Sequence, residues 1–265
     1  MKFNLSFYKR LFVIVGIMLL MIPQSVVAQQ EKPKNLLLYD TQPYHFGFII
    51  ALNQMSYSID YKENYQLVLH DPDEFINDGD YNRPSNPTYV RSINPEPHYG
   101  FTVGVVGNLR LGKYFDLRLI PTLSFGTRIV EYQIYETVTE INPYQTFKKS
   151  VFSTFMEFPL LVKYKSKRHN NFAAYLIGGG NFKVDLASQK RETSSEGVKN
   201  IKLNRSDLAA EIGAGVDFYT GYFKFGIEAK MSFGLLNIMD AQGLFYDTSI
   251  NSLHNRMFQL SLTFE

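Results

Sequence analysis

The sequence predicts an all-β fold, an eight-stranded antiparallel transmembrane β-barrel of the outer membrane with a plugged lumen. Polarity alternates with a period of two over segments long enough for tilted membrane-crossing strands, which need ~9–11 residues. Long and short connections alternate between these segments, as is typical of outer-membrane barrels. The chain also begins like a secreted protein. These three observations together favour a barrel.

The N-terminus predicts a secretory signal peptide over residues 1–28. Three cations precede an apolar run at 11–22, and a stretch of small residues ends at Ala28. A spanning helix needs ~20 apolar residues, so an uncleaved membrane anchor is the weaker alternative. We therefore expect a periplasmic N-terminal linker at 29–43 and the barrel at 44–265.

The composition excludes several classes of site. The chain has 265 residues with no Cys, 22 Phe and 18 Tyr, and its net charge is only +2. Without Cys it has no disulfide framework, thiolate metal site or lipoprotein anchor. The near-neutral charge gives no electrostatic footprint for nucleic acid. No motif identifies a cofactor or a small-molecule substrate, and none is expected.

Eight segments carry the period-two pattern of barrel strands. In the last of them Phe258, Leu260 and Leu262 alternate with polar residues, so one face is apolar and the other polar. The apolar face would meet lipid in a barrel but the interior in a soluble sandwich, so the period by itself leaves both open. The predicted strands are 44–59, 99–111, 114–128, 151–164, 171–186, 208–219, 223–235 and 256–265.

The connections decide between the barrel and the sandwich. Outer-membrane barrels have long loops at the cell surface and tight turns in the periplasm, whereas a sandwich has no reason to alternate them. The same alternation places both ends of the barrel in the periplasm. The long connections are expected at 60–98, 129–150, 187–205 and 236–255, and the short ones at 112–113, 165–170 and 220–221.

The turn at 220–221 predicts how its two strands pair. If these two residues form the whole turn, Asp217 lies opposite Lys224 on the polar face. Glu211 then lies opposite Lys230. Opposite charges would therefore meet across this hairpin.

The polar faces of the strands predict a network of charges in the lumen. An eight-stranded barrel has an interior that side chains just fill. Charges of both signs confined there should pair, because an unpaired buried charge is costly. The network would plug the lumen. Its expected members are Arg110, Arg118, Arg128, Glu157, Lys163, Glu211, Asp217, Lys224, Glu228 and Lys230.

The first long loop is rich in carboxylates, which are the hard oxygen ligands that calcium prefers. Their spacing does not match the helix-loop-helix calcium pattern, so a solvated acidic loop is the better interpretation. The residues concerned are Asp71, Asp73, Glu74, Asp78 and Asp80.

One histidine has a spacing that a catalytic pair could use. His254 lies two residues from Ser252, whereas the other four histidines are scattered along the chain. A barrel enzyme needs a nucleophile and a base brought together. A loop histidine with satisfied hydrogen bonds is the better interpretation, so we expect no enzymatic activity.

A basic turn follows the fourth predicted strand. Lys165, Lys167 and Arg168 lie close together there and are candidates for contact with an acidic partner. The alternative is that these charges only orient the barrel in the membrane.

Three stretches carry a resemblance to a known family. They read YHFGF at 44–48, EFPLLVKY at 157–164 and YLIGG at 175–179. The chain resembles the PorT family, also called SprT, over nearly all of its predicted mature length. The 157–164 stretch is the most specific, because Pro inside a strand is unusual and needs a local reason.

The resemblance implies a function. The PorT family consists of small outer-membrane barrels required by the type IX secretion system, which exports proteins bearing a C-terminal signal domain and in some bacteria supports gliding motility. A non-enzymatic accessory or assembly component is implied, with outer-membrane lipid and other secretion components as its partners. The alternatives are a structural or ligand-binding small barrel and, less favoured, a barrel enzyme that modifies lipid A.

Overall fold

The computed structural model describes residues 33–265 except 73–83, 85, 138–143, 188–202 and 240–247. Residues 34–265 form one compact unit, and the predicted signal peptide lies outside the described residues. No helix in the described part of the chain is long and apolar enough to cross a membrane. The elements are η1 (Tyr39–Thr41), β1 (Tyr44–Tyr61), η2 (Tyr65–Leu67), β2 (Leu69–His70), β3 (Thr88–Glu96), β4 (His98–Arg110), β5 (Phe115–Leu119), β6 (Thr122–Glu136), β7 (Tyr144–Lys165), β8 (Phe172–Asp185), β9 (Ser206–Tyr219), β10 (Lys224–Gly234) and β11 (Ile250–Phe264).

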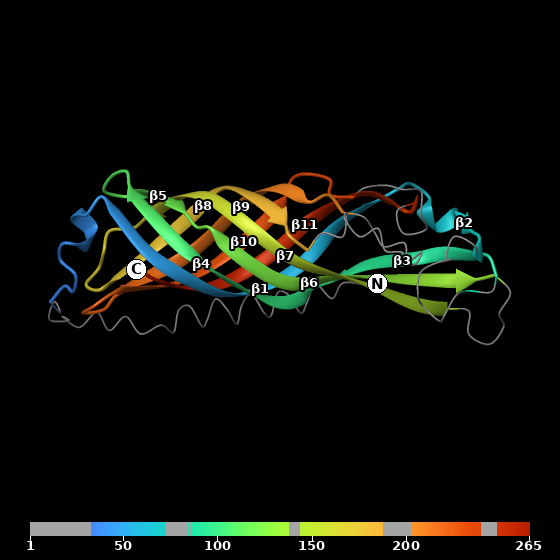
Figure 1. Cartoon of the computed structure of the whole chain (residues 1–265), viewed down its shortest axis with the longest axis horizontal. Helices are drawn as coiled ribbons and strands as arrows, with labels where there is room; N and C mark the ends of the chain where they lie inside the picture. Colours follow the sequence, from blue (N-terminus) through green and yellow to red (C-terminus); the bar gives the residue numbers. More distant parts are fainter. Residues whose placement is uncertain (1–32, 73–83, 85, 138–143, 188–202, 240–247) are drawn as a thin grey trace, which may run out of the picture. The chain divides into compact units, whose positions relative to one another are not determined.

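Strand pairing closes the sheet into a ring (Figure 1). β1 pairs with β11 on one side and with β4 on the other, so the first and last strands meet. The ring then runs through β5 and β6, which together form one ring strand, and through β7, β8, β9 and β10 back to β11. All these pairs are antiparallel. The prediction of an eight-stranded antiparallel barrel is confirmed.

Two prolines break the third ring strand, which we expected to be continuous over 114–128. β5 and β6 pair with β7 in one unshifted register on both sides of the gap. Pro121 lies in the gap and Pro159 lies opposite it, and neither has an N–H to donate to the ladder. The Ile120 N–H donates to the Pro159 carbonyl oxygen at 3.2 Å and holds the two strands together there. The break between β5 and β6 thus accommodates a residue without an N–H at position 159, in the 157–164 stretch.

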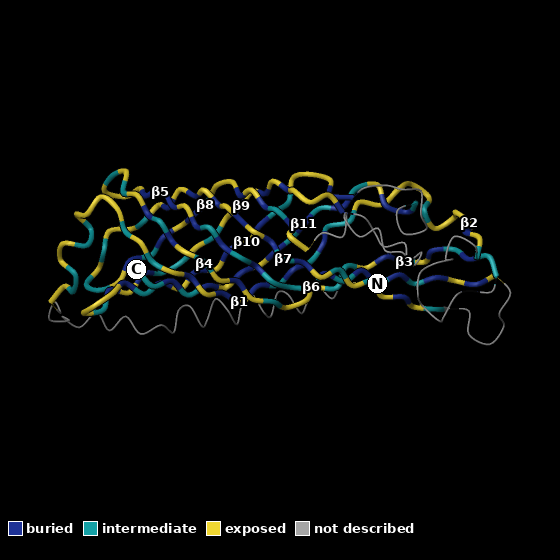
Figure 2. The backbone as a smooth tube through the Cα atoms, viewed as in Figure 1, coloured by how far each residue is buried: buried dark blue, intermediate teal, exposed yellow. Residues whose placement is uncertain are grey.

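β7 separates two environments along its length. From 152 to 164 its exposed residues are mainly apolar, while Glu157 and Lys163 are buried on the other face. Before Phe152 the polarity reverses, because Lys148 is exposed and Phe147 is buried. Figure 2 shows the alternation of buried and exposed residues along the strands. One part of the strand thus has a polar interior, and the other has an apolar interior.

The length of β7 explains this reversal. At ~3.4 Å per residue and a tilt of ~45°, a strand of 22 residues spans roughly twice the ~25 Å apolar band of an outer-membrane barrel. Only part of β7 can therefore face lipid. We call the part of the sheet beyond that band, built from β3, the end of β6 and the start of β7, the extension.

The extension corrects two predicted loops, 60–98 and 129–150, and β11 begins at Ile250, inside the predicted loop 236–255. The first contains β3, and the second is largely the hairpin of β6 and β7, which pair from Thr122 to Tyr135. A hydrophobic core fills the interior of the extension, so these strands bury apolar side chains although they lie beyond the ring. Its buried residues are Tyr57, Val90, Ile93, Val130, Tyr132, Ile134, Phe147, Leu203, Ile238, Met239, Ile250 and Leu253.

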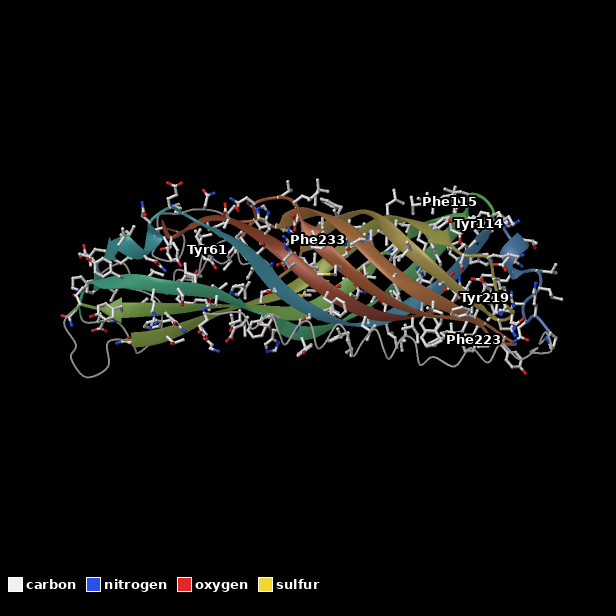
Figure 3. All side chains as sticks on the ribbon, turned by 180° about the vertical axis from the view of Figure 1, so that it is seen from behind. Tyr61, Tyr114, Phe115, Tyr219, Phe223 and Phe233 are labelled. Atoms are coloured by element: carbon white, nitrogen blue, oxygen red, sulfur yellow. The ribbon has the colours of Figure 1, made fainter. Side chains whose placement is uncertain are left out.

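The barrel wall below the extension has an apolar exterior. Figure 3 shows Tyr114, Phe115 and Phe223 at the end of the barrel where the short turns lie, which we call the turn end. Exposed aromatic residues at the rims are typical of the girdles that meet the membrane interface. The larger exposed side chains of this wall include Phe46, Phe48, Leu52, Phe101, Val105, Leu160, Leu176, Ile212, Phe218 and Leu260.

The hairpin of β9 and β10 corrects the predicted pairing. The turn has four residues, 220–223, because the Thr220 hydroxyl donates to the Phe223 carbonyl oxygen at 2.7 Å and accepts from its N–H. Asp217 therefore pairs with Gly226, and Lys224 pairs with Tyr219. The two-residue turn at 220–221 was wrong, and the register is shifted by two residues.

Candidate functional site

Arg118 forms the centre of the charge network at the turn end. Its Nη1 lies 2.7 Å from Glu228 Oε2, and its Nη2 lies 3.2 Å from Glu265 Oε1. All three side chains are fully buried. Tyr175 also donates to Glu228 Oε2, at 2.9 Å. One guanidinium therefore joins β5, β10 and the residue that follows β11 across the lumen.

Two lysines complete this end of the network. Lys163 Nζ lies 2.6 Å from Asp217 Oδ2, while Lys224 Nζ lies 3.7 Å from the same oxygen. Lys224 is closer to Glu265, at 2.9 Å. The sequence paired Asp217 with Lys224 across one hairpin, but the shorter contact of Asp217 crosses the lumen to β7.

A glycine makes room for Tyr175. The Tyr175 ring lies against Gly215 in the neighbouring strand, and a Cβ at that position would come within 2.4 Å of the ring. Lys163 Nζ lies 3.6 Å from the ring centroid, within the range of a cation–π contact. The Gly-rich polar face of β9 therefore accommodates aromatic bulk in the lumen.

The middle of the lumen holds a second group of ion pairs. Lys183 lies 3.1 Å from Glu157, and Lys230 lies 2.8 Å from Glu211. Asn181 joins the two pairs, because its Nδ2 donates to both carboxylates at 2.7 Å. Each cation thus has its own carboxylate, and the amide fixes their spacing.

Arg128 occupies the lumen near the extension. It lies 2.9 Å from Asp185 and donates to Ser153 and Asn255. Its guanidinium carbon lies 4.9 Å from the centroid of the Tyr57 ring and 4.8 Å from that of Phe155. Arg128 therefore lies where the polar lumen meets the apolar core of the extension.

The predicted network residues lie in the lumen with one exception. Arg110 is only half-buried, and its Nε donates to the Gly112 carbonyl oxygen at 3.2 Å, so it belongs to the turn. The buried residues Arg118, Arg128, Glu157, Lys163, Glu211, Asp217, Lys224, Glu228 and Lys230 make the contacts described above.

The buried charged residues that sequence reasoning missed include Lys183, Asp185 and Glu265. Glu265 has the same parity as the polar face of the last strand, which could have identified it. The other two lie in the strand whose alternation the glycines at 178–180 blur. That strand nevertheless runs through the glycines without a shift in register.

The described part of the predicted linker folds over the turn end and forms what we call the cap, residues 34–42. Arg168 donates to the Asn35 carbonyl oxygen and lies 3.6 Å from Asp40. Tyr219 donates to Asp40 Oδ1 at 3.1 Å, and Tyr39 donates to Glu265 Oε2 at 3.1 Å. The cap is therefore hydrogen-bonded directly to the lumen network.

Tyr39 is the deepest contact of the cap. Burial, together with the Glu265 carboxylate, raises the pKa of the Tyr39 phenol well above its ordinary value. The phenol therefore keeps its proton and remains a donor to Glu265. The Tyr39 ring also stacks on His45 at 3.8 Å between centroids.

The basic turn is only partly available to a partner. Lys165 lies 2.9 Å from Asp116 and is mostly buried, and Arg168 holds the cap. Lys167 and His169 are exposed. Of the three residues expected to contact a partner, Lys167 therefore presents its charge to solvent.

Comparison with known protein families identifies the family of this chain. Residues 28–240 match the family described as outer membrane protein beta-barrel domain. The chain belongs to this family. This outer-membrane barrel is therefore in contact with membrane lipid, and the soluble sandwich is excluded.

Two solved structures are similar to this outer-membrane barrel. The outer membrane protein OprG from Pseudomonas aeruginosa is 12% identical, with 84% of this chain and 96% of that chain covered and a TM-score of 0.36. Ail, the attachment invasion locus protein of Yersinia pestis, is 9% identical, with 84% and 98% covered and a TM-score of 0.31. No curated protein matches at a significant level.

The candidate catalytic pair forms a hydrogen bond in this outer-membrane barrel. His254 Nε2 lies 3.2 Å from Ser252 Oγ. Among the described residues, the other ring nitrogen, Nδ1, is buried without a hydrogen-bond partner. A base that activates a serine is normally oriented by a third group at that nitrogen. The arrangement therefore lacks the orienting group among the residues the structure describes.

The described residues contain no group of three or more potential metal ligands. Four of the predicted calcium candidates lie outside the described residues: Asp73, Glu74, Asp78 and Asp80. The fifth, Asp71, is described.

We predict that the purified barrel shows no stable open conductance in planar lipid bilayers. Paired charges and aromatic rings are buried in the lumen, and the cap is hydrogen-bonded at the turn end, so we expect no continuous water path. Single-channel recording measures this directly, with a bilayer lacking protein and one holding a known porin as controls. Steady large-conductance steps would contradict the prediction.

Proposed function

We propose that this outer-membrane barrel is a non-conducting component of type IX protein secretion that supports a separate translocon through contacts. The observation that carries the proposal is the closed lumen, filled by ion pairs such as Arg118 with Glu228 and covered by the cap. A barrel closed in this way has no route for folded cargo. The resemblance of three stretches to the PorT family supplies the link to secretion.

The proposed orientation places the turn end in the periplasm and the extension at the cell surface. Short turns lie in the periplasm of outer-membrane barrels and longer connections lie outside. We further propose that residues 1–28 are removed on export and that the former linker is the periplasmic cap. Contacts with other secretion components would then use the exposed outer face of the extension or the turn end.

Deleting the gene is predicted to block export of cargo with C-terminal signal domains and to leave other outer-membrane proteins at normal levels. The cargo should accumulate in the periplasm, because the translocon would lose a supporting contact. Quantitative immunoblots of periplasm, outer membrane and medium measure this, with re-expression of the intact chain as the control. If cargo still reaches the cell surface in the deletion strain, the secretion role is wrong and a purely structural barrel remains.

Two surface variants locate the contact in the same assay. Lys148→Glu changes the outer face of the extension, where Lys148 lies 2.6 Å from Glu96 in an exposed ion pair. Lys167→Glu changes the turn end instead. Exposed ion pairs contribute only ~0–1 kcal/mol, so the Lys148 variant should fold normally. Loss of export in only one of the two variants identifies the end that meets the partner.

A further inference from the structure

A groove of about 630 Å³ runs along the outer wall of the barrel near the turn end. It lies over β8, β9 and β10, with β11 at one side, on the face that meets lipid. Its volume falls in the ~300–1,000 Å³ range of small-molecule sites. We call it the wall groove, and its defining residues are Ala174, Ala214, Ala229, Leu176, Ile227 and Leu260.

A row of cross-strand neighbours explains why the wall is hollow there. Leu176 pairs with Ala214, Ala214 pairs with Ala229, and Ala229 pairs with Leu260. Outward side chains in one row of a sheet stand side by side, so two methyl groups lie between two longer leucines. The floor of the groove is therefore low and its sides are raised.

The groove continues to the turn end through Ala174 and Ser166. Ser166 begins the turn that carries the exposed Lys167 and His169. The other two cations of this turn are engaged, since Lys165 pairs with Asp116 and Arg168 holds the cap. An apolar channel thus ends beside an exposed positive charge at the level of the aromatic rim.

We propose that the wall groove binds one acyl chain of an anionic phospholipid whose phosphate lies against Lys167. The apolar floor fits a hydrocarbon chain, and the cation at its end fits the phosphate. A lipid chain is flexible enough to fill this narrow groove. The flat wall of a second barrel would pass over the groove and leave it empty. This inference concerns the membrane around the barrel and does not depend on the proposed role in secretion.

The absence of Trp from the chain allows a clean test. The groove variant, Phe172→Trp, places a fluorophore beside the groove, because Phe172 lies 5.9 Å from the groove residue Phe218 between ring centroids. The reference variant, Phe46→Trp, places one on β1, where the exposed residue contacts ordinary bulk lipid. Each variant is reconstituted in phosphatidylcholine vesicles that contain either brominated phosphatidylglycerol or brominated phosphatidylcholine as the quencher.

The expected result for the groove variant is an association constant for phosphatidylglycerol about fivefold above that for phosphatidylcholine, as one lysine near anionic lipid provides. In the reference variant the two lipids should quench the fluorophore equally. Equal quenching by the two lipids in the groove variant would overturn the proposal.

Two further changes in the Phe172→Trp background separate the parts of the site. Lys167→Gln should abolish the preference for the anionic lipid, and Lys113→Gln, at another exposed turn of the same end, should leave it unchanged. Ala214→Leu fills the groove with an outward apolar side chain and should reduce quenching by both lipids. A preference that survives Lys167→Gln, or a crosslinked second copy that protects the groove fluorophore from both lipids, would reject the phospholipid site.

Discussion

Replacing Arg118 with alanine is expected to lower the free energy of unfolding by about 3–5 kcal/mol. The change removes the cation that Glu228 and Glu265 share; Glu265 keeps Lys224 at 2.9 Å, whereas the buried Glu228 loses its ion-pair partner. A buried charge without a partner costs far more than the pair contributes, because water cannot solvate it. Urea titration of the barrel in lipid vesicles, followed by tyrosine fluorescence, measures the loss. Lys113→Ala, at an exposed turn, is the matched control and should change little.

A double variant tests the physical cause of this loss. Removing Arg118 and Glu228 together, as Arg118→Met with Glu228→Gln, should be less destabilising than the sum of the two single changes. The expected coupling is about 0.5–3 kcal/mol, the range for residues in one network. Additive losses would show that the two side chains are not partners, and a loss below about 1 kcal/mol for Arg118→Ala would show that the lumen admits water.

Replacing Ile50 with arginine should cost about 2–4 kcal/mol, the cost of a cation near the middle of the membrane. Ile50 is exposed on the outer face of β1 and pairs with Leu262 of β11 and Val103 of β4, well inside the apolar wall. The same unfolding titration measures the loss. Thr146→Arg is the matched control, because Thr146 is exposed on β7 beyond the apolar band. Equal effects at both positions would place the band elsewhere on the barrel.

The ring and its two faces could be predicted from sequence because they follow from period two alone. Lys163 and Glu157 were placed inside, and Leu160 outside, by parity within a single strand. Burial in the structure follows the same parity. Which neighbouring strands pair could also be predicted, because short turns leave few alternatives.

The extension was missed although its strands carry the same period. Val130, Tyr132 and Ile134 alternate with polar residues, yet they continue a strand already long enough to cross the membrane, so we assigned them to a loop. Their inward faces are apolar because Ile93 and Leu253 pack with them in a core that water does not enter. An alternation with a period of two shows that a strand has an apolar and a polar face, but it does not show which face points into the barrel.

The charge pairs across the lumen could not be predicted. Lys163 and Asp217 are 54 positions apart, and their contact depends on the diameter of the ring and on rotamers that no local pattern encodes. The cap was missed for a related reason. Its hydrogen bonds run from Asn35 and Tyr39 to groups more than 130 residues away, and a short polar segment has no periodicity to reveal a binding surface.

The reversal of polarity along β7 fixes how deeply the protein sits in the membrane. On the outer face, Ser150 and Phe152 are adjacent positions with opposite preferences. If the barrel moved deeper, so that the extension approached the membrane, Ser150 and then Lys148 would enter the hydrocarbon. If it moved the other way, Phe152 would leave the hydrocarbon and enter water. Both movements are unfavourable from the boundary between Ser150 and Phe152, so the barrel has a single preferred depth in the membrane. The extension therefore stands at a constant distance from the membrane, and any partner that binds its outer face meets it at that height.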